Sequence, residues 1–296
     1  MPLDPTALGY TSPTIPVSWD ERDTMLYALS IGAGTDDLEY TTENSIGVQL
    51  TTTPSMPVVY CQPSSDVWDR LGEFDWSCLV HAAQSLELHT PMPPAGTGSI
   101  TTTITEMSDK GTAAVVTART ELRDNDGTPL ATGDSTVFIR GAGGWGGDRG
   151  ATGKPPTPEG HADRKATVTT APTQALLYRL NADRNPLHSD PAFARKANFD
   201  RPILHGLCTL GIAILSVART KHTPGMQLQR FSARFANSCY PGDALTTRMW
   251  FTNGSTAAPE AAPPGTTGSR NVAFDTLGPG GVAILSQGAA TFGPPT

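Results

Sequence analysis

One stretch of this chain, residues 203–217 (ILHGLCTLGIAILSV), constrains the fold most, because as a helix it is apolar on nearly every face. Asp200 and Pro202, just before it, are typical N-cap and first-turn residues. A helix that is apolar all round belongs inside a structure, where other elements cover each face. We therefore expect a long antiparallel sheet curled around one buried helix.

Strand-like text fills the later part of each half of the chain. The first half contains the β-branched runs SITTTITEMS, GTAAVVTARTEL and STVFIRG, separated by turn signals at 109–111 and 125–127. The second half contains QLQRFSARFANS, ALTTRMWFTNG, SRNVAFDTL and GVAILSQGAATFG, with a Pro-Gly-Asp turn at 241–243. These patterns predict antiparallel hairpins in both halves. The first half has no equally convincing helix, and its nearest candidate, DVWDRLGEFDWSCLVHAAQ, is more polar.

A change of composition divides the chain. From residue 141 the text runs GAGGWGGDRGATGKPPTPEGHADRK, which is rich in Gly, Pro and charge. Such a stretch cannot bury enough apolar surface to offset the entropy lost on ordering it. The 296 residues also suffice for two domains. We predict an N-terminal domain over 1–147, a linker over 148–170 and a C-terminal domain over 171–296.

The bulk properties exclude several classes of protein. The formal net charge of −7 disfavours nucleic acid as a partner, although an anionic ligand could still bind a local basic patch or backbone N–H groups. No apolar run reaches the length of about 18 residues that a membrane-spanning helix needs, so no such helix is expected. The N-terminus MPLDPTALGY lacks a secretion signal, so we expect a cytoplasmic protein with reduced cysteines. No His, Cys and carboxylate cluster has a metal-binding spacing, and no metal is expected.

The residues that carry chemistry lie in 178–206, YRLNADRNPLHSDPAFARKANFDRPILHG. Asn185 and Pro186 force a turn, so Asp183 and His188 lie on either side of a bend and can face one pocket. A carboxylate and an imidazole aimed at one water or one C–H bond are suited to proton transfer in both directions. Asn185 between them can orient a water. The alternative is a polar loop in which Asp183 and His188 make only local caps.

The dipeptide His205-Gly206 lies at the start of the apolar helix. A helix N-terminus presents unpaired N–H groups and the positive end of the helix dipole. Glycine there would let a ligand carbonyl approach the backbone closely, as an oxyanion site requires. The alternative is that Gly206 is small only to allow helix–sheet packing.

The runs NADRNPLHSDP and FDRPILHGLCT resemble the hydratase-2 motif of the MaoC-like dehydratases. That family includes (R)-specific 2-enoyl-CoA hydratases and the hydratase domain of peroxisomal multifunctional enzymes. The resemblance extends through WDERDTMLYALSIGAG, LVHAAQSLELHTPMPPAG, DKGTAAVVTARTELRDNDGTPLAT and FIRGAGGWGG, and so covers most of the chain. It implies an α+β double hot-dog fold, in which antiparallel β-sheets wrap around a central helix and two hot-dog repeats pack in one chain.

The resemblance also implies roles for particular residues. Asp183 and His188 match the catalytic pair, Asn185 matches the water-orienting amide, and Gly206 matches the glycine whose N–H receives the thioester oxygen. The candidates for substrate and CoA binding are His81, Ala82, Lys110, Arg184, Asn185, Pro186, Leu187 and Phe235. Because they come from both halves, a cleft between the halves is expected.

The activity implied by the resemblance is the reversible hydration of a trans-2-enoyl-CoA to the (R)-3-hydroxyacyl-CoA. It would need no cofactor and would be carried out by a homodimer. The alternatives are a hot-dog acyl-CoA thioesterase, a class that lacks the D-x-N-P-L-H run, and a non-catalytic acyl-CoA-binding subunit. Two positions depart from the family pattern, because Ala82 and Ala182 stand where glycine is usual. Straight, branched and steroid side-chain acyl groups are all compatible with the sequence.

Overall fold

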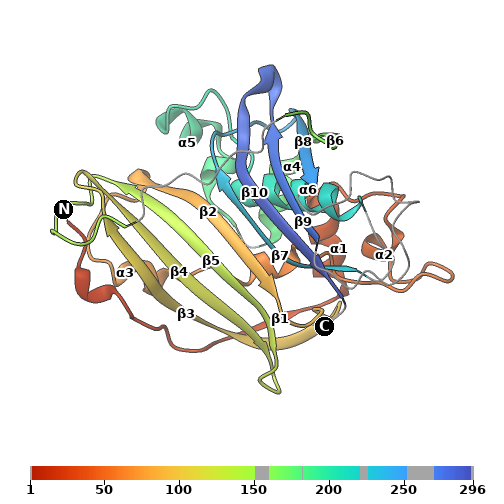
Figure 1. Cartoon of the computed structure of the whole chain (residues 1–296), viewed down its shortest axis with the longest axis horizontal. Helices are drawn as coiled ribbons and strands as arrows, with labels where there is room; N and C mark the ends of the chain where they lie inside the picture. Colours follow the sequence, from red (N-terminus) through yellow and green to blue (C-terminus); the bar gives the residue numbers. More distant parts are fainter. Residues whose placement is uncertain (1, 151–159, 182, 221–225, 252–269, 295–296) are drawn as a thin grey trace. The chain divides into compact units, whose positions relative to one another are not determined.

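The computed structural model describes residues 2–150, 160–181, 183–220, 226–251 and 270–294 (Figure 1). The chain forms two compact units. Unit 1 comprises Met1–Ser18, Pro57–Thr90 and Thr97–Pro156, and unit 2 comprises Trp19–Met56, Pro91–Gly96 and Thr157–Thr296.

In unit 1 the strands are hydrogen-bonded in the order β1-β3-β4-β5-β2. Its strands are β1 (Ile15–Trp19), β2 (Leu79–Leu88), β3 (Gly96–Asp109), β4 (Ala113–Asp124) and β5 (Pro129–Arg140). The pairs β3–β4 and β4–β5 are antiparallel, and the connections at 109–111 and 125–127 join them, as the sequence predicted. Along β5 nearly every second side chain is buried, as expected for a sheet with one face against a core.

The predicted helix candidate at 66–84 is largely wrong. Only its beginning is helical, in α3 (Ser65–Asp69), and a 3-10 turn η3 (Trp76–Cys78) follows. The remainder enters β2, which pairs with β5 in antiparallel register. The pairing of β2 with β5 overrides the helix propensity of its alanines, because strand preference depends mainly on cross-strand neighbours.

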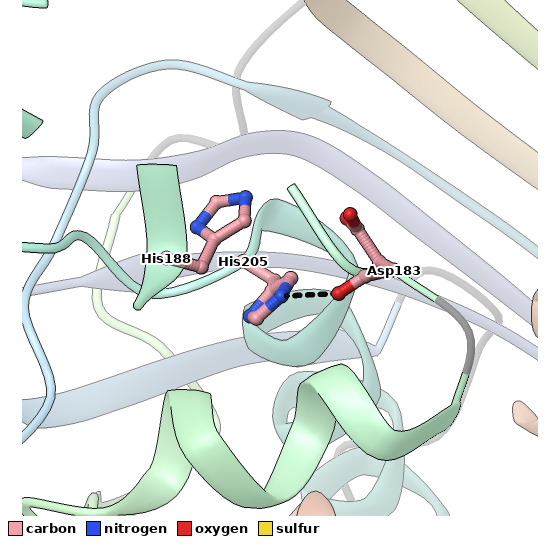
Figure 2. Close-up of side chains that lie close together, drawn as sticks. All are labelled: Asp183, His188 and His205. Carbon is pink, nitrogen blue, oxygen red and sulfur yellow. Dashed lines mark hydrogen bonds between the residues drawn. The ribbon is translucent and has the colours of Figure 1, made fainter. Parts of the chain in front are cut away.

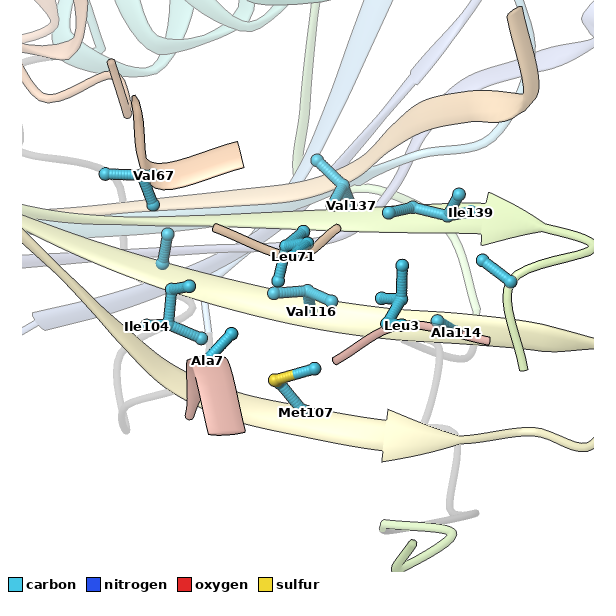
Figure 3. Packing of buried hydrophobic residues seen from close by; sticks show 12 residues of the cluster. Leu3, Ala7, Val67, Leu71, Ile104, Met107, Ala114, Val116, Val137 and Ile139 are labelled. Atoms are coloured by element: carbon cyan, nitrogen blue, oxygen red, sulfur yellow. The ribbon is translucent and has the colours of Figure 1, made fainter. Parts of the chain in front are cut away.

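Short helices rather than a long one cover the core of unit 1 (Figure 3). The buried cluster draws on the N-terminal turn η1 (Pro5–Ala7), on α3 and the residues after it, and on the inner faces of β3, β4 and β5. Its members are Leu3, Ala7, Val67, Leu71, Ile104, Met107, Ala114, Val116, Ala118, Val137, Ile139 and Ala142. The first half of the sequence has no strong helix signal, and accordingly short helical segments contribute to the core of this unit in place of one long helix.

In unit 2 the strands are hydrogen-bonded in the order β7-β10-β9-β8-β6. Its strands are β6 (Arg164–Thr169), β7 (Gln227–Phe235), β8 (Ala244–Phe251), β9 (Arg270–Leu277) and β10 (Ala283–Gly293). All the adjacent pairs are antiparallel. The four later strands were predicted. β6 was missed, because it lies inside the predicted linker 148–170, of which 151–159 fall outside the described residues.

The apolar segment forms α6 (Gly206–Ala218), and every side chain from Cys208 to Val217 is buried. It packs against β7, β8 and β10, which confirms the buried central helix (Figure 1). The predicted N-cap residues are wrong, since the N-cap is His205 rather than Asp200. The preceding residues stay extended because their N–H groups bond elsewhere: Leu204 donates to Cys239 O at 2.8 Å. In the described part of the chain no helix is long and apolar enough to cross a membrane.

Helix α1 (Glu21–Ser30) also belongs to unit 2, although the sequence placed residues 1–147 in one domain. The reason is packing against α6. The Cys208 Sγ lies 3.4 Å from the Ser30 carbonyl oxygen, and the Arg219 Nε donates to Asp37 Oδ1 at 2.9 Å. The N-terminal segment therefore completes the cover around the buried helix.

Gly211 allows α1 and α6 to approach each other closely. A Cβ atom at this position would lie 2.5 Å from Ile31 Cγ2 and 3.1 Å from the Tyr27 hydroxyl. Overpacking of this kind costs about 1–3 kcal/mol, whereas alanine gains only about 1 kcal/mol over glycine in helix propensity. We expect Gly211→Ala to lower the free energy of unfolding by about 1 kcal/mol, measured by urea denaturation. A variant as stable as the wild type would contradict this packing.

Candidate active site

The loop that carries Asp183 and His188 is folded by its own sequence. It follows α4 (Gln174–Tyr178) and η4 (Arg179–Asn181), and it leads through η5 (Pro186–His188) into α5 (Pro191–Lys196). Asn185 caps η5, because its Oδ1 accepts the Leu187 N–H at 3.0 Å. The Asn185 N–H donates to Asp183 Oδ1 at 3.1 Å. The predicted turn thus holds the carboxylate on one side and the imidazole on the other.

Three ionisable side chains meet at this loop (Figure 2). One ligand atom from each of Asp183, His188 and His205 lies within 4.8 Å of the others. Asp183 is exposed, whereas His188 is 8% exposed and His205 only 1% exposed. The sequence predicted that Asp183 and His188 share a site but assigned no role to His205. Its position directly before the glycine at the helix start was the available signal.

His188 is held as a neutral imidazole with one defined tautomer. Its Nδ1 lies 2.9 Å from the backbone oxygen of Ile203. A carbonyl can only accept, so Nδ1 carries the proton and Nε2 is unprotonated in the neutral ring. Burial lowers the pKa of His188, and the bond to Ile203 and the charge of Asp183 only partly oppose this. The Nε2 atom is therefore available to exchange a proton.

His205 lies against both of these residues. Its Nε2 is 3.3 Å from the backbone oxygen of Asp183, the bond drawn in Figure 2. Its ring stacks on that of His188 with centroids 3.7 Å apart and planes 26° from parallel. Burial, reinforced by the neighbouring His188, lowers the pKa of His205 to about 4. His205 is therefore neutral at neutral pH.

The low pKa of His205 predicts a pH dependence of stability. The unfolded chain binds a proton at this residue below about pH 6.5, whereas the folded chain resists it down to about pH 4. Folding stability is therefore full above pH 6.5 and falls as the pH drops towards 4. We expect the urea midpoint to fall between pH 6.5 and 5 by more in the wild type than in His205→Phe. An equal fall in both proteins would contradict the low pKa.

The three side chains are suited to two kinds of chemistry. A carboxylate beside a neutral imidazole can move a proton to and from a ligand. Two imidazoles and a carboxylate are also a ligand set for a divalent cation of borderline softness. In addition, each imidazole already holds one nitrogen against a backbone carbonyl, as metal-binding histidines commonly do. The same three side chains are therefore chemically suited both to proton transfer and to binding a divalent cation.

Gly206 follows His205 directly and lies against the ring of Phe235. As the first residue of α6, Gly206 has an N–H with no acceptor within the helix, at the positive end of its dipole. A Cβ atom at Gly206 would lie 3.1 Å from Phe235 Cδ1. A side chain at this position would therefore crowd the aromatic ring, so the close approach of Gly206 to Phe235 depends on glycine.

The other predicted binding residues are distributed between the units. Arg184 and Pro186 are exposed, and Leu187 is half-buried, in the loop of unit 2. His81 and Ala82 lie on β2, and Lys110 lies in the β3–β4 turn, all in unit 1. The Lys110 Nζ donates to the Arg149 carbonyl oxygen. Ala182 lies outside the described residues. The roles of these residues in ligand binding stay predictions.

Comparison with protein families gives two adjacent matches. Residues 17–141 match the model of the MFE-2 hydratase 2 N-terminal domain, and residues 154–262 match that of the MaoC like domain. The chain is 38% identical to 3-hydroxyacyl-thioester dehydratase Y of Mycobacterium tuberculosis, over 85% of this chain and 89% of that protein. It is 37% identical to the enoyl-CoA hydratase ChsH3 of the same organism, over 84% of this chain and 90% of that protein.

Solved structures show the same fold. A MaoC-like dehydratase from Phytophthora capsici superposes with a TM-score of 0.79 and 27% identity, covering 97% of both chains. A Mycobacterium tuberculosis protein described as a double hotdog fold superposes with a TM-score of 0.59 and 12% identity, covering 97% of this chain and 96% of that one. The expected α+β double hot-dog fold is thereby confirmed.

Proposed function

This chain belongs to the MaoC-like dehydratase family of the hydratase 2 type, and we propose that it catalyses the reversible hydration of a trans-2-enoyl-CoA to the (R)-3-hydroxyacyl-CoA. It is a hydro-lyase, since its relatives carry the names enoyl-CoA hydratase and 3-hydroxyacyl-thioester dehydratase. The observation that supports the assignment of residues is the approach of Asp183 to the neutral His188 within 4.8 Å.

In the proposed mechanism, Asp183 and Asn185 hold the attacking water. As the water oxygen bonds to the β-carbon, the Asp183 carboxylate takes one of its protons. His188 gives a proton from Nε2 to the α-carbon, and it takes this proton back during dehydration. Because Nε2 of the resting His188 is unprotonated, the pair first takes up one proton from solution, and this proton lies on His188 Nε2 when hydration begins. After the reaction the pair again holds one proton, which has come from the water and lies on Asp183. The lowered pKa of His188 makes its imidazolium a strong donor for this step.

Gly206 would stabilise the charge that develops on the thioester oxygen. As the α-carbon accepts or loses a proton, negative charge passes to that oxygen. The Gly206 N–H at the start of α6 can donate to it, and one such donor contributes roughly 3–4 kcal/mol in other enzymes. The ring of Phe235 packs beside this point and would contact the thioester.

The direct test uses purified full-length protein with crotonyl-CoA and with a longer 2-enoyl-CoA. We expect the ultraviolet absorbance of the enoyl thioester to fall, free thiol to stay constant, and the product to be the (R)-alcohol. Release of free CoA thiol would instead identify a thioesterase. Tight binding of these substrates and of a steroid side-chain enoyl-CoA, without turnover of any, would identify a binding subunit and overturn the proposal.

The proposed reaction uses no cofactor, although Asp183, His188 and His205 could also hold a cation. We therefore expect exhaustive dialysis against a chelator to change kcat by less than about twofold, because the Asp183 and His188 pair itself moves the protons. The rate is measured with crotonyl-CoA before and after dialysis. Loss of activity that Zn²⁺ restores would show that a metal acts at this cluster.

The cellular location, oligomeric state and pathway of the enzyme are further parts of the proposal. We propose a cytoplasmic homodimer that acts in fatty-acid or steroid side-chain metabolism. Relatives in plants and animals carry names that place them in the peroxisome. Light scattering after size exclusion tests the dimer, and rates with short, long and branched enoyl-CoA thioesters and with a steroid side-chain thioester rank the acyl group.

A further inference from the structure

His205 lies between the two groups that the proposed function uses. Its Nε2 lies 3.3 Å from the backbone oxygen of Asp183, and its ring stacks on His188 at 3.7 Å. On a third side, the ring of Tyr178 lies 5.0 Å away at 49°. His205 therefore contacts Asp183 and His188 at once, while its own side chain is 1% exposed.

The hydrogen bonds define the protonation of His205. Because the Asp183 carbonyl only accepts, Nε2 carries the proton. Nδ1 is buried, and among the described residues it has no hydrogen-bond partner. A second proton at Nδ1 would be an unpaired buried donor, which is unfavourable, and would place a positive charge against His188. The other ionisable groups that act on the ring are Tyr178, Arg179 and Asp183. His205 is therefore a neutral ring whose Nδ1 is unprotonated.

We propose that His205 is a positioning residue, which fixes the Asp183 backbone through Nε2–H and the His188 ring through stacking, and which exchanges no proton itself. This inference rests on the proposed function. Helix capping does not explain why this position is a histidine, because the His205 side chain makes no capping hydrogen bond to α6. The expected consequence of losing His205 is therefore a change in kcat and not in helix formation.

Two variants separate the hydrogen bond that His205 makes to Asp183 from its stacking on His188. His205→Phe keeps a stacking ring but removes the donor to Asp183, and His205→Gln keeps an amide donor but removes the ring. Misplacement of reacting groups by about 1 Å can cost about 10²-fold in rate. We expect His205→Phe to lower kcat by about 10- to 100-fold with KM within about twofold, and His205→Gln to recover part of the loss. The control is His161→Phe on the exposed loop, which should keep wild-type kinetics.

Nitrogen NMR of the histidine rings tests the inference without any assay. The expected spectrum at pH 7 shows His205 protonated at Nε2 only and His188 protonated at Nδ1 only. A cationic His205, or one protonated at Nδ1, would overturn the proposal. So would a His205→Phe variant with wild-type kcat, or one whose loss is entirely in KM. Absence of hydration by the wild type would instead refute the proposed function and leave the NMR result standing.

Discussion

Replacing Asp183 with asparagine is expected to lower kcat for enoyl-CoA hydration by about 10²- to 10⁴-fold. The asparagine amide cannot take a proton from the attacking water. Its oxygen can still accept the Asn185 N–H, which lies 3.1 Å from Asp183 Oδ1. Because Asp183 is exposed, the fold should persist, and the thermal midpoint should stay near that of the wild type. Initial rates with crotonyl-CoA give the effect.

A matched control lies in the same loop. Asp190 is the N-cap of α5, where its Oδ1 accepts the Ala192 N–H at 2.7 Å and the Phe193 N–H at 3.2 Å. Asparagine caps a helix as well as aspartate does, so Asp190→Asn should keep kcat within about twofold of the wild type. If Asp183→Asn turned over nearly as fast as this control, Asp183 would have no part in proton transfer.

Local signals in the sequence were sufficient to predict part of the site. Asn185 and Pro186 define a turn through short-range geometry, and this turn places Asp183 and His188 together as expected. The apolar sequence of α6 also predicted a buried helix from local information alone, since a helix without a polar face has to be covered by other elements. The hairpins β3–β4 and β4–β5 of unit 1 and β9–β10 of unit 2 followed from their turn residues and β-branched runs. The predicted turn at 241–243 joins β7 to β8, which are not neighbours in the strand order and form no hairpin.

The errors came from elements whose structure depends on distant partners. β2 contains alanines that favour helix, and its pairing with β5 decides its conformation. β6 is short and polar, and only its pairing with β8 makes it a strand. α1 lies in the first half of the sequence but packs on α6, which requires a small residue far along the chain at Gly211.

The role of His205 was missed for the same reason. Its contacts are with Asp183, 22 residues earlier, and with the ring of His188. The start of α6 at Gly206 also depends on distant bonds, since Leu204 bonds to Cys239 and so remains extended ahead of the helix. No local pattern encodes such contacts, and the helix start is therefore three residues later than the apolar text alone indicates.

The second large effect is expected from His188→Asn, which should lower kcat by about 10²- to 10⁴-fold. The asparagine amide nitrogen can occupy the place of Nδ1 and donate to Ile203, a bond of 2.9 Å in the wild type. The variant then lacks only Nε2, the atom proposed to serve the α-carbon. We expect its urea midpoint to remain close to the wild-type value, so that the loss of rate is chemical.

His188→Ala is the comparison that separates chemistry from folding. It removes the donor to Ile203 as well and leaves a buried carbonyl unpaired, so its free energy of unfolding should fall by about 1–3 kcal/mol. Its kcat should nevertheless match that of His188→Asn. Because Asp183 and His188 share one proton, the double variant Asp183→Asn/His188→Asn should be little slower than the slower single variant. If the fold reduction of kcat in the double variant equalled the product of the two single reductions, the two residues would serve separate steps. That result would contradict the shared-proton mechanism.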